Sequence, residues 1–306
     1  MNISLQYFLT VVEMQSISKA AERLFVSQQN LSNHIKRLES RYGILFTRKP
    51  KFMLTPSGEA LLETLNQIRI LENGLQTKLQ DIQDNSVGSV RIGLHTARAR
   101  ILLPSTIAEF QRRYPRVRLE IVHADTADYE NMLENGDIDL FLGIDTRFHR
   151  DFSYIHLKEE AVFLLATQTL LEKCGCRQTR PSHVTKRELC SLPLIFSPQS
   201  SNLQTKIQGF LQKNQIAPPP QIVAGDFTLQ MQLACEHLGA CFCPQMFLSG
   251  EKILLQRPVE PLLTCTVEGF SICNHPAIIT NNKMYLPHYI DVLIDILKRN
   301  AERCLV

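Results

Sequence analysis

The chain contains carboxylates, histidines and cysteines, but their spacing matches no catalytic signature. It has no G-x-S-x-G, no P-loop, no G-x-G-x-x-G and no H-E-x-x-H, the patterns that position a nucleophile, a phosphate or a zinc ion. Asp137 and Asp139 could form a carboxylate pair. However, they lie where a turn leads into the apolar strand 138–144, and carboxylates at the start of a strand are usually caps or exposed to solvent. We therefore expect no enzyme, no catalytic residue, no cofactor and no metal site.

The nine cysteines offer thiol chemistry. Cys174 and Cys176 lie in segment 173–189, which has no clear period and predicts a surface loop with at most a short helix. Basic residues flank the pair, and nearby cations lower the pKa of a thiol and favour the reactive thiolate. A redox switch is therefore one hypothesis. Cys241 and Cys243 alternate with apolar residues and predict strand core, and packing without function is the alternative for every cysteine.

Segment Ser16–Gly43 carries two short helical patterns. Apolar residues recur at helical spacing on both sides of the short link Phe25-Val26-Ser27. Ser18 and Ser27 are placed to cap the two helices, because a serine oxygen can accept a free amide of the first turn. Two short helices joined by so tight a turn predict a helix-turn-helix.

The second of these helices would bury Leu31, Ile35 and Leu38 and turn its polar residues outward. Amides can read adenine edges with two hydrogen bonds, and cations neutralise phosphates. A merely solvated face is the alternative interpretation, but this face carries no carboxylate. Its outward residues are Gln28, Gln29, Ser32, Asn33, Lys36 and Arg37.

After the second helix, apolar segments 45–47 and 52–55 flank a basic turn, a pattern that predicts a wing. The run from about Leu5 to Leu62 closely resembles the DNA-binding head of the LysR-type transcriptional regulators, through YFLTVVEMQSISKAAERLFVSQQNLSNHIKRLESRYGILFTRKP and LTPSGEALL. Family members often have proline where this chain has Gln29, a departure that bears on base preference. The resemblance implies that Ser27, the outward face and the wing residues Arg48, Lys49 and Lys51 bind DNA.

The charge distribution agrees with a DNA-binding head. Residues 1–60 hold eight Lys or Arg and four Asp or Glu, a net charge of +4; the whole chain carries +3, so the remainder carries 3 − 4 = −1. A positive surface on the head is what phosphate contacts require. No apolar run approaches the length of a membrane span and no signal peptide opens the chain, which predicts a cytoplasmic protein with reduced thiols and no membrane partner.

Residues 56–84 predict one long helix with a single apolar seam, in which Glu72 is the one polar position. A helix with only such a seam is not stable alone, so the pattern favours a coiled-coil-like dimerisation element, as the LysR resemblance also implies. Packing against the chain's own second domain is the alternative. The seam residues are Leu61, Leu65, Ile68, Leu75, Leu79 and Ile82.

From Ser89 onward, short apolar strands alternate with helices, which predicts mainly parallel sheets with helices on both faces. The stretches VRIGL, ENGDIDLFLGI, LPLIFSP and GDFTLQMQLACEHLGACFCP resemble the family's effector domain, built like a periplasmic binding protein. We expect an α/β chain with an α-dominated winged head, and crossovers near Ala166 and Val267. The expected division is 1–60 for the head, 61–88 for the linker helix and hinge, and 89–306 for the effector domain, with subdomain I about 89–166 and 267–306 and subdomain II about 167–266.

The resemblance implies a transcriptional regulator that binds a double-stranded DNA operator as a homodimer or homotetramer, with RNA polymerase as a further partner. It also implies a small-molecule co-inducer between the subdomains. Ligands sit beyond the carboxyl ends of parallel strands, where hydroxyls and helix N-termini could receive an anion. Two alternatives stay open: switching by thiol oxidation, and a small-molecule binding protein with a vestigial head. The candidate effector-binding residues are His95, Thr96, Thr126, Asp145, Ser197 and Ser200.

Overall fold

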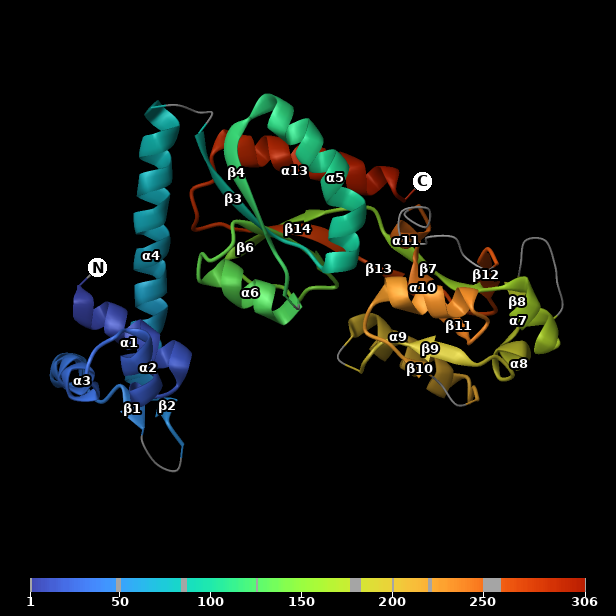
Figure 1. Cartoon of the computed structure of the whole chain (residues 1–306), viewed down its shortest axis with the longest axis horizontal. Helices are drawn as coiled ribbons and strands as arrows, with labels where there is room; N and C mark the ends of the chain where they lie inside the picture. Colours follow the sequence, from blue (N-terminus) through green and yellow to red (C-terminus); the bar gives the residue numbers. More distant parts are fainter. Residues whose placement is uncertain are drawn as a thin grey trace. The chain divides into compact units, whose positions relative to one another are not determined.

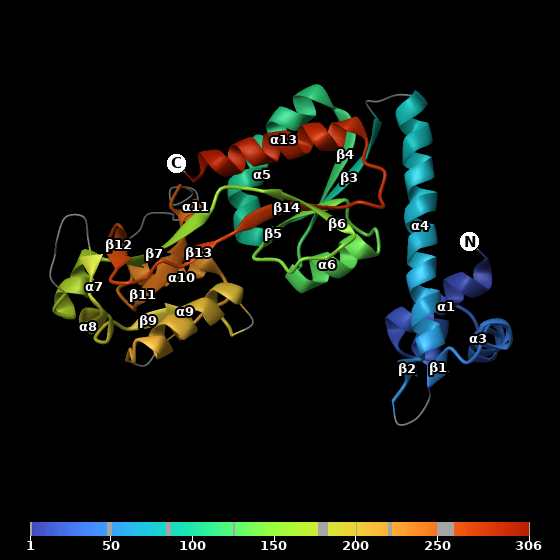
Figure 2. The same ribbon diagram turned by 180° about the vertical axis from the view of Figure 1, so that it is seen from behind.

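The computed structural model of the chain describes residues 2–47, 51–83, 87–124, 126–176, 183–199, 201–219, 222–249 and 260–305. The chain divides into two compact units. The first comprises Met1–Gln76 with Glu134–Gly136, and the second comprises Thr77–Leu133 with Asp137–Val306. Among the described residues, no helix combines the length and the apolar character that a membrane crossing would need. Figures 1 and 2 show the elements of both units from opposite sides.

Three short helices form the core of the first unit: α1 (Ile3–Met14), α2 (Ile17–Arg23) and α3 (Gln28–Tyr42). Ala20 and Ala21 of α2 are buried beside the apolar side of α3, and their small side chains let the two helices lie close. Ser27 caps α3 as predicted, since its Oγ accepts the amide of Asn30 at 3.2 Å. The prediction for Ser18 was wrong, because α2 begins earlier and Ser16 is its cap, accepting the amide of Lys19 at 3.4 Å.

The turn between α2 and α3 depends on one left-handed residue. Phe25 has φ 55° and its side chain is 96% exposed. The amide of the next residue, Val26, then donates to the Ala21 carbonyl at 3.1 Å. A left-handed residue just after a helix closes the last turn and redirects the chain. This conformation lets the four residues Leu24–Ser27 redirect the chain from α2 into α3.

The wing consists of β1 (Phe46–Thr47) and β2 (Met53–Leu54), which pair antiparallel with Phe46 opposite Leu54. The rings of Phe46 and Phe52 stack with centroids 4.8 Å apart. Helix α4 (Pro56–Gln83) follows at once, and the Oγ1 of Thr55 accepts the amide of Gly58 at 3.1 Å. A Cβ at Gly58 would collide with the Leu45 carbonyl, so this glycine lets the first turn of α4 approach the wing.

The apolar side of α4 serves two different purposes. Leu65 is 1% exposed and belongs to the core of the head, and Leu61 packs partly against the same core. Leu65 was therefore assigned wrongly to an open seam. Farther along the helix a stripe remains exposed, and it includes Leu71 rather than the predicted seam position Glu72. The stripe comprises Ile68 (38% exposed), Leu71 (67%), Leu75 (59%) and Leu79 (52%); the side chain of Ile82 lies outside the described residues.

In the described part of the second unit, the first sheet has five strands in the order β4-β3-β5-β14-β6. β3 is parallel to β4 and β5, whereas β14 is antiparallel to β5 and β6. Along β14, Ile278 packs under helices α5 and α13, and its neighbour Ile279 packs under α6. This period of two gives the sheet two covered faces. The elements are β3 (Val87–Gly93), α5 (Thr96–Arg113), β4 (Arg116–Val122), α6 (Thr126–Glu134), β5 (Leu140–Ile144), β6 (Phe152–His156), β14 (Pro276–Asn281) and α13 (His288–Arg303).

The second sheet is also covered on both faces. Leu164 of β7 packs in one cluster of apolar residues, and its neighbour Leu165 packs in another. Its described strands run in the order β10-β9-β11-β7-β12-β8, and β13 also pairs with β7. The strands are β7 (Glu160–Ala166), β8 (His183–Val184), β9 (Leu194–Phe196), β10 (Ile222–Val223), β11 (Ala240–Pro244), β12 (Leu263–Val267) and β13 (Cys273–Asn274). The helices are α7 (Gln168–Lys173), α8 (Lys186–Leu189), α9 (Asn202–Lys213), α10 (Phe227–Cys235) and α11 (Gln245–Ser249).

The chain passes between the two sheets at places other than those predicted. It leaves the first sheet after His156, enters the second at Glu160, and returns between Asn274 and Pro276. The predicted crossover near Ala166 is therefore too late and the one near Val267 too early, and the subdomain boundaries drawn there were misplaced. An apolar run predicts a strand, but the sheet that a strand joins depends on distant partners. Both sheets also contain antiparallel pairs beside the predicted parallel ones.

Candidate nucleic-acid interface and effector site

The outer side of α3 is polar, as the sequence predicts. Its Leu31, Ile35 and Leu38 are buried in the core of the head. The opposite side presents amides and cations but no carboxylate, which is the chemistry of base edges and phosphates. Gln28, Gln29, Asn33, Lys36 and Arg37 are exposed, and Ser32 is half-buried.

Helix α3 is fixed to α1 by a polar contact at its inner edge. The Nδ1 of His34 lies 2.8 Å from the Oγ of Ser4, and the His34 ring packs edge-on against Tyr7 with centroids 5.0 Å apart. Ser27 is exposed, and its Oγ already accepts the Asn30 amide. A helix held in this way presents its outer side chains from a rigid base, which precise recognition requires.

The basic turn of the wing is described in part. Lys51 is exposed next to β2. Arg48 and Lys49 lie outside the described residues. The pairing of Thr47 with Met53 brings the two ends of the basic segment together.

Asp139, one of the two carboxylates considered in the sequence, has a structural role. Asp139 is 8% exposed, and its Oδ2 accepts the Arg91 amide at 2.7 Å while its Oδ1 accepts Arg91 Nη2 at 2.7 Å. The residue thereby fixes the start of β5 beside β3. A carboxylate occupied by a backbone amide and a guanidinium holds strands in register and is poorly placed for proton transfer.

Two predicted effector residues stand at the end of β3. His95 is the N-cap residue of α5, but its side chain makes no capping hydrogen bond, and both His95 and Thr96 are exposed. Ser200 and the side chain of Thr126 lie outside the described residues.

Asp145 follows β5 and connects the two sheets. Its Oδ2 accepts the Nζ of Lys206, on α9, at 2.7 Å, and its Oδ1 lies 2.9 Å from the Nδ1 of His275. Burial alone would raise the pKa of Asp145, but the hydrogen bonds from Lys206 and His275 and the Lys206 charge outweigh it, so this pKa lies below its ordinary value. Lys206 and His275 were not among the predicted effector residues, because no local pattern links them to Asp145.

Ser197, at the end of β9, joins the two helices that follow. Its amide donates to Gln204 Oε1 of α9 at 3.0 Å, and its Oγ accepts Gln230 Nε2 of α10 at 3.0 Å. In this network, the buried Nε2 of Gln204 finds no hydrogen-bond partner among the described residues. A buried polar atom without a partner is costly, and a bound water or other polar group is one way to satisfy it. Ser197 was among the predicted effector residues, but Gln204 was not.

The thiols differ from the expectation of a reactive surface pair. Cys174 ends α7, and Cys176 is 8% exposed in the core of the second sheet. Burial and the charge of Glu188 raise the pKa of Cys176 to about 11, and burial raises that of Cys174. Cys241 and Cys243 are buried in β11 as predicted, with burial raising the pKa of Cys241 to about 12.

Comparison with protein families gives two matches that together span nearly the whole chain. The model described as "LysR substrate binding domain" matches residues 83–302, and the model described as "Bacterial regulatory helix-turn-helix protein, lysR family" matches residues 4–59. The chain belongs to the LysR family of transcriptional regulators. It is thus a DNA-binding regulator and, like other LysR family members, not an enzyme.

Similar LysR family proteins include a probable RuBisCO transcriptional regulator of Thalassiosira pseudonana, 24% identical over 90% of both chains. The transcriptional activator CmpR of Synechocystis is 23% identical over 97% of this chain and 94% of that protein. The Bacillus subtilis regulator YcgK is more similar, at 32% identity, over 44% of this chain and 43% of its own length.

Solved structures share the fold along the whole chain. A full-length OxyR variant of Pseudomonas aeruginosa has a TM-score of 0.68 at 20% identity and covers 97% of this chain and 95% of its own. Full-length CbnR, in a complex with its target DNA, has a TM-score of 0.61 at 18% identity over 97% of this chain and 98% of its own. LysR regulators bind DNA and form oligomers.

Proposed function

We propose that this LysR regulator reads its operator through the outer side of α3. The supporting observation is that five polar or basic side chains without a carboxylate are exposed there on a helix whose other side is buried. Gln29 and Asn33 stand near the start of α3, where side chains of a recognition helix reach base edges. Ser27, Gln28, Ser32, Lys36 and Arg37, with Arg48, Lys49 and Lys51 of the wing, provide phosphate contacts and orientation.

The regulator acts as a homodimer or homotetramer in the cytoplasm, and α4 supplies the pairing surface. The exposed stripe from Ile68 to Leu79 offers apolar side chains at coiled-coil spacing. Pairing two heads fixes the distance between two α3 helices, so the operator is an interrupted palindrome whose half-sites match that distance. RNA polymerase is the expected partner on DNA.

A small polar molecule controls the regulator by binding at the carboxyl ends of the strands in the second unit. His95, Thr96, Thr126, Asp145, Ser197 and Ser200 follow such strand ends. Support comes from the Gln204 side chain, whose Oε1 accepts the Ser197 amide while its buried Nε2 lacks a partner among the described residues. An anion suits this place because the N-terminus of α9, which begins at Asn202, carries partial positive charge.

Switching by oxidation of Cys174 and Cys176 is the alternative input. It has less support, because the pKa of each thiol is raised rather than lowered and Cys176 is buried. A protonated, buried thiol reacts slowly with oxidants. We therefore favour a small-molecule co-inducer.

Selection of genomic fragments by the purified protein tests DNA recognition. A short list of enriched fragments sharing an interrupted palindrome is expected, with binding that weakens steeply as salt rises. Equal recovery of all fragments would contradict sequence-specific recognition and would favour a binding protein with a vestigial head. The same fragments, used in thermal-shift and gel-shift assays with small anions, then test the co-inducer.

A further inference from the structure

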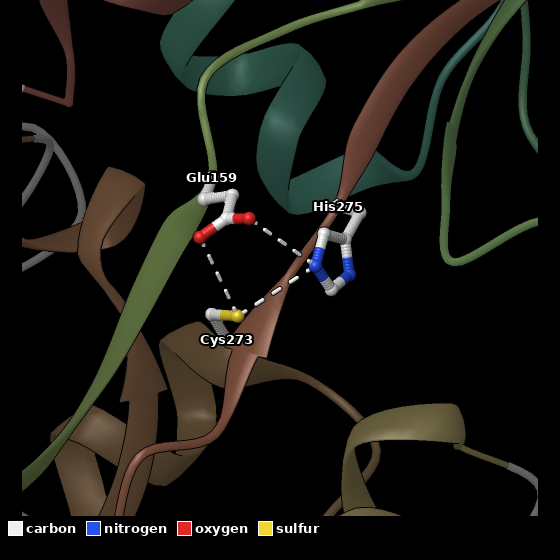
Figure 3. A group of neighbouring side chains, drawn as sticks. All are labelled: Glu159, Cys273 and His275. Carbon is white, nitrogen blue, oxygen red and sulfur yellow. Dashed lines mark hydrogen bonds and ion pairs between the residues drawn. The ribbon is translucent and has the colours of Figure 1, made fainter.

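The strands that connect the two sheets carry three side chains with the chemistry of a metal site. Glu159 precedes β7, Cys273 lies in β13, and His275 lies between β13 and β14. Figure 3 shows the three side chains pointing toward one another from neighbouring segments. Among the described residues, they form the one group whose carboxylate, thiol and imidazole ligand atoms all lie within 4.8 Å of one another.

The strand register explains why these residues meet. β13 pairs antiparallel with β7, with Cys273 opposite Ala161 and Asn274 opposite Glu160. Continuing this register places His275 opposite Glu159. Because side chains alternate along a strand, Cys273, His275 and Glu159 share one face, whereas Asn274 and Glu160 share the other. The amide of Asn274 does donate to Glu160 at 3.0 Å on that buried face.

The distances between the ligand atoms suit a small tetrahedral ion. His275 Nε2 lies 3.7 Å from Glu159 Oε1 and 3.7 Å from Cys273 Sγ, and Cys273 Sγ lies 3.9 Å from Glu159 Oε2. A zinc ion bound tetrahedrally by sulfur, nitrogen and oxygen holds its ligand atoms about 3.3–3.6 Å apart. Small side-chain rotations are enough to close the difference, since Glu159 and His275 are exposed and Cys273 is half-buried.

Asp145 orients the imidazole for this role. Its carboxylate lies 2.9 Å from His275 Nδ1, so that nitrogen donates to it and leaves the lone pair of Nε2 facing Cys273 and Glu159. Histidines that bind metals usually donate their second ring nitrogen to a carboxylate or carbonyl in this manner. Asp145 is held in turn by Lys206 Nζ at 2.7 Å.

Once metal binding has deprotonated Cys273, the charges around the group match a divalent cation. A Cys273 thiolate, Glu159 and Asp145 together carry −3, and Lys206 contributes +1, which leaves −3 + 1 = −2. Thiolate and imidazole ligands favour zinc over calcium and magnesium, which prefer oxygen ligands.

We propose that Glu159, Cys273 and His275 bind a divalent transition-metal ion, of which zinc fits best, at the junction of the two sheets. The thiol of Cys273 loses its proton to solvent as the metal–sulfur bond forms, and water fills the fourth position. The ion would connect the outgoing strand at Glu159 to the returning strand at Cys273 and His275. It would stabilise the folded second unit, since the unfolded chain does not hold the three ligands together.

Cobalt binding to the full-length, chelator-treated protein tests the site, because Co²⁺ reports thiolate ligands and tetrahedral geometry by its absorption. One Co²⁺ per chain is expected, with a sulfur charge-transfer band, displaced by Zn²⁺. Cys273→Ser and His275→Ala should abolish the band, and Glu159→Gln should weaken binding at least tenfold. Asp145→Asn should weaken binding about 10- to 100-fold through the orientation of His275. Zn²⁺ should raise the melting temperature of the wild type and leave that of Cys273→Ser unchanged.

The matched controls are Cys190→Ser and His183→Ala, because both residues are exposed on other elements of the same unit. These variants should bind cobalt like the wild type. Absence of stoichiometric binding by the wild type would overturn the proposal. Retention of the charge-transfer band by Cys273→Ser, or its loss from Cys190→Ser, would assign the metal to other thiols and would equally overturn it. Circular dichroism of each variant verifies folding, and the conservative Glu159→Gln change keeps the test informative if Cys273→Ser is unstable.

Discussion

Arg98 of α5 and Glu160 at the start of β7 form a buried, two-point ion pair. Nη2 lies 2.6 Å from Oε2 and Nη1 lies 3.1 Å from Oε1, and the residues are 5% and 0% exposed. Glu160 also accepts the Met246 amide at 3.1 Å and Asn274 Nδ2 at 3.0 Å. This carboxylate thus ties a helix of the first sheet to the strands that connect the sheets.

Loss of one partner from this pair should be strongly destabilising. Arg98→Met keeps the apolar stem but leaves the Glu160 charge buried, which should lower the free energy of unfolding by about 3–5 kcal/mol. The double variant Arg98→Met/Glu160→Gln should recover part of the loss. Urea denaturation followed by circular dichroism measures both, with Arg100→Met, exposed on the same helix, as control. If Arg98→Met lowered the free energy of unfolding by less than about 1 kcal/mol, the pair would contribute no more than an exposed surface ion pair does.

The buried thiols should resist modification. With its pKa raised from 9.0 to about 11, Cys176 has about 100-fold less thiolate at pH 8 than an ordinary thiol, and Cys241, at about 12, has still less. Iodoacetamide at pH 8, followed by mass mapping, should label the exposed Cys190 first and Cys176 and Cys241 far more slowly. In guanidinium chloride these three thiols should react at similar rates. Rapid formation of a Cys174–Cys176 disulfide with dilute peroxide would instead support the oxidation switch.

Base readout should depend on Gln29 and Asn33. Replacing either by alanine removes an amide that can form two hydrogen bonds with adenine, which should cost about 1–3 kcal/mol on the selected operator and much less on random DNA. Gel-shift titrations on both DNAs measure the difference. Gln6→Ala, which removes an exposed amide on α1, serves as the control. Equal losses on operator and random DNA would restrict these residues to phosphate contacts.

The wing should contribute charge without base preference. Lys51→Ala should weaken binding to all sequences and reduce the slope of log K against log salt by about one unit, because one fewer counterion is released. Filter binding at several salt concentrations provides the slope. The control is Lys213→Ala, which removes an exposed cation of α9 and should leave the salt slope unchanged. An unaltered slope for Lys51→Ala together with Lys49→Ala would mean that the wing does not touch DNA.

Pairing through α4 should fail when its exposed stripe carries charge. Leu71 and Leu75 are 67% and 59% exposed, so Leu71→Asp with Leu75→Asp should leave the single chain folded while making burial of the stripe against a second copy unfavourable. Sedimentation velocity should show monomers, and operator affinity should drop. Asn73→Asp with Gln76→Asp adds the same charge outside the stripe and should leave the oligomer intact. If the Leu71→Asp/Leu75→Asp variant remained an oligomer, the pairing surface would have to lie outside α4.

Much of the head follows from the sequence alone. Helical period, the Ser27 cap and the short link at Phe25 are local signals, and the segments that carry them form α2, α3 and their turn as expected. The polar outer side of α3 follows from the same period, because burial of Leu31, Ile35 and Leu38 leaves its amides and cations exposed. A local signal was misread at the start of α2, which begins at Ile17 with Ser16, not Ser18, as its cap.

The rest depends on contacts between residues far apart in the chain. Leu65 lies in the core of the head instead of in the predicted seam, because it packs there against the helices of the head. The crossovers lie elsewhere than predicted, because the partners of a strand decide which sheet it joins. Asp145 meets Lys206 and His275, and Glu159 meets Cys273 and His275, through strand register and helix placement. No period or motif within one segment specifies these contacts, because each contact forms only when the apolar faces of separate segments are buried together. The sequence therefore determined the elements and the family, and the tertiary structure decided which side chains form sites.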